Sequence, residues 1–199
     1  LTLLVNASAD TSQTVFATTL ASGGFSTMRL TPGGSQKILL NLGAFTRATS
    51  AGTIRFSLPT GAQDATNGFR TTTSNVNGIL GGWATATNVS GVTNFAANDG
   101  SGGIVLVTSA TKADVTTWAL ADHVSDGTSG YSGILAQNLG VSSLRFDSAA
   151  DSTVTIADGR VLTISSGGVL QTSAASGSII SPTVAGGRLV SGAGNELIF

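Results

Sequence analysis

The sequence predicts an all-β fold, a parallel β-helix or β-solenoid of stacked short strands with a less regular N-terminal half. The main observation is that short runs of apolar and β-branched residues return at nearly even intervals in the second half of the chain. In a β-solenoid each coil adds strands to parallel sheets, and only stacking on neighbouring coils buries its apolar face. When one apolar residue is taken to mark each run, successive marker residues are 8 to 10 positions apart. The marker residues are Leu144, Val154, Leu162, Leu170, Ile179, Leu189 and Leu197.

Composition supports the same prediction. Of the 199 residues, 41% are hydrophobic, which is enough for a continuous core. Charged residues make up only 10% of the chain, against roughly 25% in ordinary soluble domains, and there are 27 glycines. Small uncharged side chains suit tightly stacked coils, and the strand-length clusters of Val, Ile and Thr argue against disorder.

The N-terminal segment, residues 1–60, is predicted to be β-rich and to form a cap or the start of the solenoid. Ile54, Phe56 and Leu58 alternate with polar residues, which places one face of their strand inward and the other in solvent. Glycine-containing turns separate the runs. The predicted strands of this segment lie within 1–5, 14–20, 24–30, 36–42, 43–48 and 53–59.

The middle segment, residues 61–140, is less regular. Between two of its runs lies the stretch 111–131, which carries the only histidine and the only tyrosine and is predicted to be an excursion over the solenoid surface. Loops on repeat scaffolds often carry recognition. Trp118 and Tyr131 are therefore the predicted ligand-binding residues. The runs of this segment are 78–85, 93–99, 103–107 and 133–139.

The last segment, residues 141–199, is predicted to form regular coils. The two ends of the chain are predicted to be unpaired strand edges, which favour end-to-end self-association. The edge residues are Leu1, Leu3 and Val5 at one end and Leu197, Ile198 and Phe199 at the other. The unfinished ends also suggest a mature piece of something longer. The predicted inner column comprises Leu144, Phe146, Val154, Ile156, Leu162, Ile164, Leu170, Ile179, Leu189 and Leu197.

Four segments carry a resemblance to a known family. They are GILGGWAT (78–85), TNFAANDG (93–100), the run from Leu144 to Thr172, and GGRLVSGAGNELIF (186–199). Over roughly residues 75–199 the chain resembles the autotransporter-associated β-strand repeats of large bacterial surface proteins. The resemblance implies a right-handed parallel β-helix and a secreted or cell-surface passenger segment. It implies no shared catalytic site.

Candidate catalytic groups are sparse, and no catalytic residue is predicted. His123 follows Asp122, but adjacent side chains in a strand point to opposite faces, so we interpret His123 as a solvated loop histidine. The GxSxG motif is missing. Parallel β-helices also serve polysaccharide-degrading enzymes. Asp147, Asp151 and Asp158 lie near one another in the sequence, but we interpret them as turn aspartates that hydrogen-bond their own backbone.

No metal site, cofactor, nucleic-acid partner or transmembrane segment is predicted. The chain has no cysteine, and the calcium-binding nonapeptide of β-rolls is missing, so a structural calcium ion is only a weaker alternative. A net charge of −1 leaves no basic stripe for phosphates. No apolar run approaches the roughly 20 residues of a membrane span.

The predicted function is that of an extracellular or cell-surface structural protein, a stiff spacer or self-assembling fibre subunit. The alternative is an adhesin that binds surface glycans through Trp118 and Tyr131. The third reading is a polysaccharide-degrading enzyme.

Overall fold

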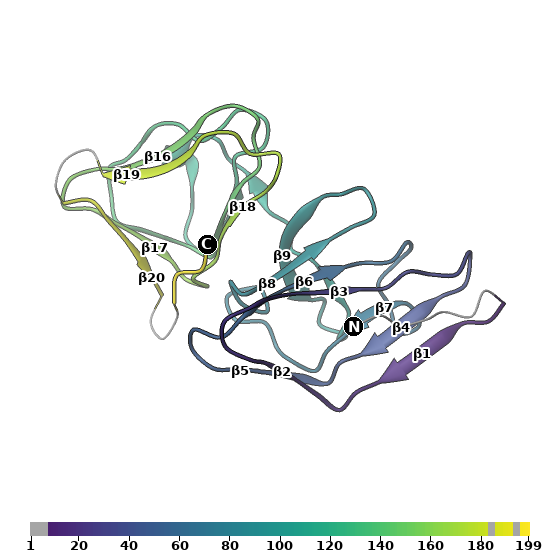
Figure 1. Cartoon of the computed structure of the whole chain (residues 1–199). Coiled ribbons are helices and arrows are strands. Elements are labelled where there is room, and N and C mark those ends of the chain that lie inside the picture. Colours follow the sequence, from purple (N-terminus) through teal and green to yellow (C-terminus); the bar gives the residue numbers. More distant parts are fainter. Residues whose placement is uncertain (1–7, 183–185, 193–195) are drawn as a thin grey trace. The chain divides into compact units, whose positions relative to one another are not determined.

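The computed structural model describes residues 8–182, 186–192 and 196–199 (Figure 1). The chain divides into two compact units, Leu1–Val107 and Thr108–Phe199, and the division falls inside the predicted middle segment (61–140). Each unit is a stack of coils, and most strands pair in parallel with a strand of the next coil. The predicted all-β solenoid is therefore confirmed.

In the first unit each full coil supplies one strand to each of three sheets. The sheets have the orders β1-β4-β7, β2-β5 and β10-β9-β8-β6-β3. Paired strands belong to adjacent coils, so paired residues are one coil apart, or 27 to 30 residues along the chain. The strands are β1 (Thr11–Thr14), β2 (Ala17–Leu20), β3 (Phe25–Arg29), β4 (Ile38–Asn41), β5 (Ala44–Arg47), β6 (Thr53–Ser57), β7 (Gly68–Arg70), β8 (Ala84–Thr87), β9 (Thr93–Asn98) and β10 (Ile104–Leu106).

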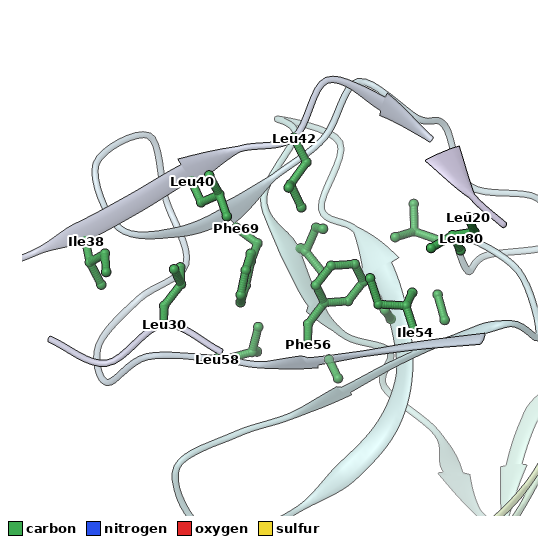
Figure 2. Close-up of a cluster of buried hydrophobic side chains, with 14 residues drawn as sticks. Leu20, Leu30, Ile38, Leu40, Leu42, Ile54, Phe56, Leu58, Phe69 and Leu80 are labelled. Atoms are coloured by element: carbon green, nitrogen blue, oxygen red, sulfur yellow. The ribbon is translucent and has the colours of Figure 1, made fainter. Parts of the chain in front are cut away.

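The core of this unit lies between the sheets, as Figure 2 shows. Ile54 and Phe56 of β6 are buried, whereas Arg55 between them is exposed, which confirms the predicted alternation. Phe56 contacts Phe45 and Phe69, with ring centroids 5.8 and 5.2 Å away. Aromatic rings thus link strands from successive coils and fill the centre of the unit.

The first unit ends in antiparallel strands, a feature that the sequence-based prediction lacked. β9 pairs antiparallel with β8, and β10 pairs antiparallel with β9. Only residues 88–92 separate β8 from β9. A connection of this length closes a hairpin but is too short for the crossover that parallel pairing needs.

The second unit is also three-sided. Figure 1 shows β18, the pair β16–β19 and the pair β17–β20 on three faces of the coil. The sheet orders are β11-β12-β15-β18, β13-β16-β19 and β14-β17-β20, all parallel. Its elements are β11 (Ala110–Thr111), the 3₁₀ helix η1 (Val115–Thr117), β12 (His123–Ser125), β13 (Ile134–Leu135), β14 (Leu139–Val141), β15 (Ser143–Phe146), β16 (Ser152–Ile156), β17 (Val161–Ile164), β18 (Val169–Gln171), β19 (Ser178–Pro182) and β20 (Arg188–Ser191).

Most of the predicted inner column is confirmed. Leu189 and Leu197 pack against the core from partly buried positions. Six predicted members are buried: Leu144, Phe146, Val154, Ile156, Leu162 and Ile164.

Two members of the predicted column were wrong by one residue. Leu144 pairs with Val169 and Val154 pairs with Ile180, so Val169 and Ile180 point inward in place of Leu170 and Ile179. Ile179 is 53% exposed. Each error falls on two adjacent apolar residues, where the alternation that selects the inward face is lost.

The predicted surface excursion, residues 111–131, was also wrong. This stretch contains the end of β11, the helix η1 and the whole of β12, and so it belongs to the coils themselves. Its strands are only two and three residues long. Such strands are too short to show the period-2 pattern by which strands are recognised.

Candidate ligand-binding groove

A groove of about 580 Å³ lies at the corner of the first unit where the β1-β4-β7 sheet turns into the β2-β5 sheet. Gly43 lies one coil above Phe16, and Thr72 lies one coil above Gly43, since Thr72 N–H donates to the Gly43 carbonyl at 3.1 Å. Gly43 has φ +64°, and a Cβ there would lie 2.1 Å from the Phe16 carbonyl oxygen. The position therefore requires glycine, because the backbone of Phe16 occupies the space that a side chain would need.

A ladder of polar side chains forms one wall of the groove. Thr14 of β1 pairs with Asn41 of β4, which in turn pairs with Arg70 of β7. Asn41 Nδ2 donates to Thr14 Oγ1 at 3.2 Å, and a guanidinium N–H of Arg70 donates to the carbonyl of Ser101. Stacking identical positions of successive coils thus places hydrogen-bonding groups in a row along the coil axis.

The turn 98–103 closes one end of the groove. Asn98 Oδ1 accepts the backbone N–H groups of Gly100 and Gly102, at 2.9 and 3.0 Å. Asp99 Oδ1 accepts those of Ser101 and Gly103, at 2.7 and 2.9 Å. Two side chains therefore satisfy four donors of one short turn, which holds the turn in a single conformation.

The groove was missed in the sequence because its residues are far apart along the chain. Thr14 and Asn41 are 27 residues apart, a separation of one coil, and Arg70 follows in the next coil. The available signal was this coil period. The sequence analysis used only the spacing of 8 to 10 residues between successive runs, which does not show which residues of successive coils are neighbours.

The two predicted ligand-binding residues, Trp118 and Tyr131, lie in the core of the second unit. They are 5% and 2% exposed. Their rings stack edge to face with centroids 5.1 Å apart, and Tyr131 makes the same contact with Phe146 at 5.1 Å. The expectation that they present a surface for stacking on sugars was therefore wrong, because the surrounding segment is part of the coils.

Tyr131 also anchors a buried polar network. Its hydroxyl donates to the Arg145 carbonyl at 2.8 Å, and its backbone N–H donates to Ser152 Oγ at 2.7 Å. Burial and the neighbouring Asp126 carboxyl raise the pKa of Tyr131 well above its ordinary value. The neutral phenol is thus kept as a hydrogen-bond donor, and the ring serves the fold.

Asp147, considered above for catalysis, and the nearby Asp126 hold turns and neighbouring coils together. Asp126 is fully buried and accepts the backbone N–H groups of Asp147 and Ser148 at 2.7 and 3.1 Å. Asp147 forms an ion pair with Arg145 at 2.8 Å and accepts the Thr172 hydroxyl. Across the described ranges no three histidine, aspartate or glutamate side chains gather at one point. The weaker calcium alternative stays a prediction.

His123 lies in β12 and is half buried, whereas we expected a solvated loop. Its Nδ1 is 2.8 Å from Ser143 Oγ on the neighbouring strand. Burial lowers the pKa of His123, and the adjacent Asp122 only partly opposes this effect. The Asp122 carboxylate forms an ion pair with Lys112, with Oδ2 2.6 Å from Nζ. It therefore does not orient the imidazole as the aspartate of a catalytic triad would.

We expect the second unit to lose stability as the pH falls from 7 to 5. The pKa of His123 is lower in the folded protein than its ordinary 6.5, so the unfolded chain takes up the proton first and acid favours unfolding. The stability is fully present above pH 6.5 and is lost on acidification toward the folded pKa. Urea unfolding at several pH values, followed by Trp118 fluorescence in a Trp83→Phe background, measures the loss.

The variant His123→Gln is the control for this pH dependence and should remove most of it. Asp122 does not interfere in this window. Burial opposes ionisation of Asp122, yet hydrogen bonds from Lys112 and Ala119 hold its pKa below 3.8, so its contribution is lost only at more acidic pH. An unchanged slope between pH 7 and 5 in the variant would contradict the role of His123.

The predicted assembly edges fall partly outside the described residues. Leu1, Leu3 and Val5 lie there. At the other end Leu197 packs against the core of the second unit, and Ile198 pairs with Gly168. Phe199 is 81% exposed. In the described part of the chain, no helix is long and apolar enough to span a membrane.

Comparison with known proteins gives one informative similarity. The chain is 33% identical over 162 residues to the adhesin BmaC autotransporter of Brucella suis biovar 1 (strain 1330). The match covers 77% of this chain, and the chain spans 4% of that protein's length. No protein-family model and no solved structure matches the chain. The similarity confirms the resemblance to autotransporter-type bacterial surface proteins predicted from the sequence.

Proposed function

We propose, from the resemblance to an autotransporter adhesin, that this chain is a non-enzymatic segment of a bacterial surface adhesin. In this role the solenoid is a stiff spacer that carries the corner groove as a contact site. The observation that carries the proposal is the parallel stacking of coils within each unit, combined with the similarity to a protein named as an adhesin. Localisation at the cell surface or outside the cell follows from the same proposal.

Stiffness follows from the way in which the coils are joined. Every coil of a solenoid is bonded to its neighbours by backbone ladders and by a shared apolar core, so bending requires breaking both. In the second unit β15 joins β12 and β18, and β16 joins β13 and β19. A spacer of this kind holds a contact site away from the bacterial surface without a flexible linker.

Adhesion is tested with beads that carry the whole 199-residue chain. We expect them to attach to a panel of epithelial cells and glycan-coated surfaces more than beads coated with albumin do. Beads with the chain denatured before coupling are the matched control, because they carry the same composition without the fold. Equal attachment of folded and denatured chains, or no attachment to any surface, would refute the adhesive role.

Self-assembly into fibres is the second proposed role. β3 lies at the outer edge of its sheet in the first unit, as do β19 and β20 in the second. Unpaired edges of this kind can template a further copy. Negative-stain electron microscopy distinguishes the two roles, since long regular fibres support assembly and isolated short particles support a spacer alone. Truncation of residues 195–199 without loss of fibres would exclude the C-terminal edge.

A further inference from the structure

We propose that the corner groove of the first unit binds an acidic polysaccharide, with a uronic-acid carboxylate at Arg70 and a sugar ring on Phe16. The inference rests on the proposed adhesive function and names the ligand class for it. It draws on the charge of the groove, its unused hydrogen-bonding groups, its exposed aromatic ring and its direction along the coils.

Arg70 supplies the charge. Among the described residues it is the only charged one that lines the groove. Its side chain is half buried, and its partner within the described ranges is the Ser101 carbonyl, with no carboxylate in an ion pair. A guanidinium has five N–H donors in a planar fork that matches a carboxylate. One donor holds the side chain against the turn, so the others remain for an anion.

Neighbouring side chains supply groups that suit sugar hydroxyls. Thr72, Ser74 and Ser101 line the groove, and their hydroxyls have no hydrogen-bond partner among the described residues. The side-chain amide of Asn41 donates one N–H to Thr14, and its oxygen Oδ1 is left to accept a hydrogen bond from a ligand. A hydroxyl both donates and accepts, and an amide does the same through two atoms. This mixture matches the hydroxyl groups of a saccharide better than it matches an apolar ligand.

Phe16 supplies a flat apolar face. Phe16 is one of the residues that line the groove, and it is 94% exposed. Exposure of an aromatic ring to water is unfavourable in free energy, so covering the ring with another apolar surface is favourable. The C–H face of a sugar ring provides such a surface while its hydroxyls remain at the polar wall.

The direction of the groove favours a chain over a single sugar. Thr14, Asn41 and Arg70 come from three successive coils, which are about 4.8 Å apart, so the row spans about 10 Å. A span of this length faces more than one sugar unit. The turn 98–103 is already fixed by four hydrogen bonds, so binding does not require that it be ordered first.

The test is calorimetric titration of the whole chain with a hyaluronan hexasaccharide, which carries a carboxylate on alternate sugars. We expect binding that weakens with salt and is reduced at least about tenfold in Arg70→Gln. Arg55→Gln is the matched control, because Arg55 is an exposed arginine of the same unit that stacks on Phe25 outside the groove. Circular dichroism of both variants verifies that the fold persists.

The aromatic contact is tested in the same way with Phe16→Ala, and Phe25→Ala is its control. We expect the first to weaken binding and the second to leave it unchanged. Equal binding of the carboxyl-reduced, neutral hexasaccharide would overturn the acidic ligand class. If poly-glutamate displaces the hexasaccharide and Phe16→Ala does not weaken hexasaccharide binding, the groove is a site for acidic peptides and the saccharide proposal is overturned.

The proposed function and this inference fail in different ways. Bead attachment that persists in Arg70→Gln, together with no hexasaccharide binding, refutes the groove inference and leaves the adhesive role standing. Hexasaccharide binding without bead attachment refutes the adhesive role and supports the groove.

Discussion

Replacement of Phe56 by alanine should cost the first unit about 3–5 kcal/mol of unfolding free energy, the usual range for truncating a buried phenylalanine. Phe56 has no exposed surface and packs between Phe45 and Phe69, which lie on neighbouring coils. Its removal leaves a cavity that the hydrogen-bonded coils cannot close by moving together. Urea unfolding followed by Trp83 fluorescence, in a Trp118→Phe background, measures the loss.

Phe16→Ala is the matched control, because it removes the same atoms from a side chain that is 94% exposed. Its effect on the unfolding free energy should stay within about 0.5 kcal/mol. A loss in Phe56→Ala no larger than that of the control would show that the three aromatic rings do not form the centre of the core.

Replacement of Asp126 by alanine should destabilise the second unit by about 3 kcal/mol or more, since each buried donor left without an acceptor costs about 1–3 kcal/mol. Its carboxyl group accepts backbone N–H groups from Asp147 and Ser148, and Ser152 Oγ donates to it at 2.8 Å. Alanine would leave three donors without this acceptor, and two of the three hydrogen bonds that it removes are buried. Unfolding followed by Trp118 fluorescence is the measurement.

Two further variants make this prediction specific. Asp126→Asn keeps an acceptor oxygen for the two N–H groups and should cost less than alanine. Asp158→Ala removes an exposed aspartate from a turn of the same unit and should change the unfolding free energy by less than about 0.5 kcal/mol. Equal losses in Asp126→Ala and Asp158→Ala would contradict a structural role for the buried carboxyl.

The regular coils could be predicted because their strands recur with turns between them. The runs 143–147, 153–157 and 160–165 correspond to β15, β16 and β17. β7 and β12 were not predicted, since each is three residues long and holds a single apolar side chain, whereas the equally short β10 and β18 each hold at least two. A strand of that length is held by its neighbours in the sheet, and its own sequence carries no alternation to reveal it.

The candidate site could not be predicted for a related reason. Phe16 and Arg70 lie in different coils, and neither stands in a motif. Trp118 and Tyr131 were selected as rare aromatics in an irregular stretch, a feature that does not distinguish a surface loop from a short-stranded coil. Burial of an aromatic ring depends on which segments pack above and below it.

By itself the sequence determined the fold class, most of the strand positions and most of the inward column, because strand propensity and period-2 alternation are local properties. Only the tertiary structure decided the register at Val169 and Ile180, the burial of Trp118 and Tyr131, and the groove at Gly43. These features depend on which residues meet when coils stack. Residues about one coil apart become neighbours only once the backbone ladders have formed.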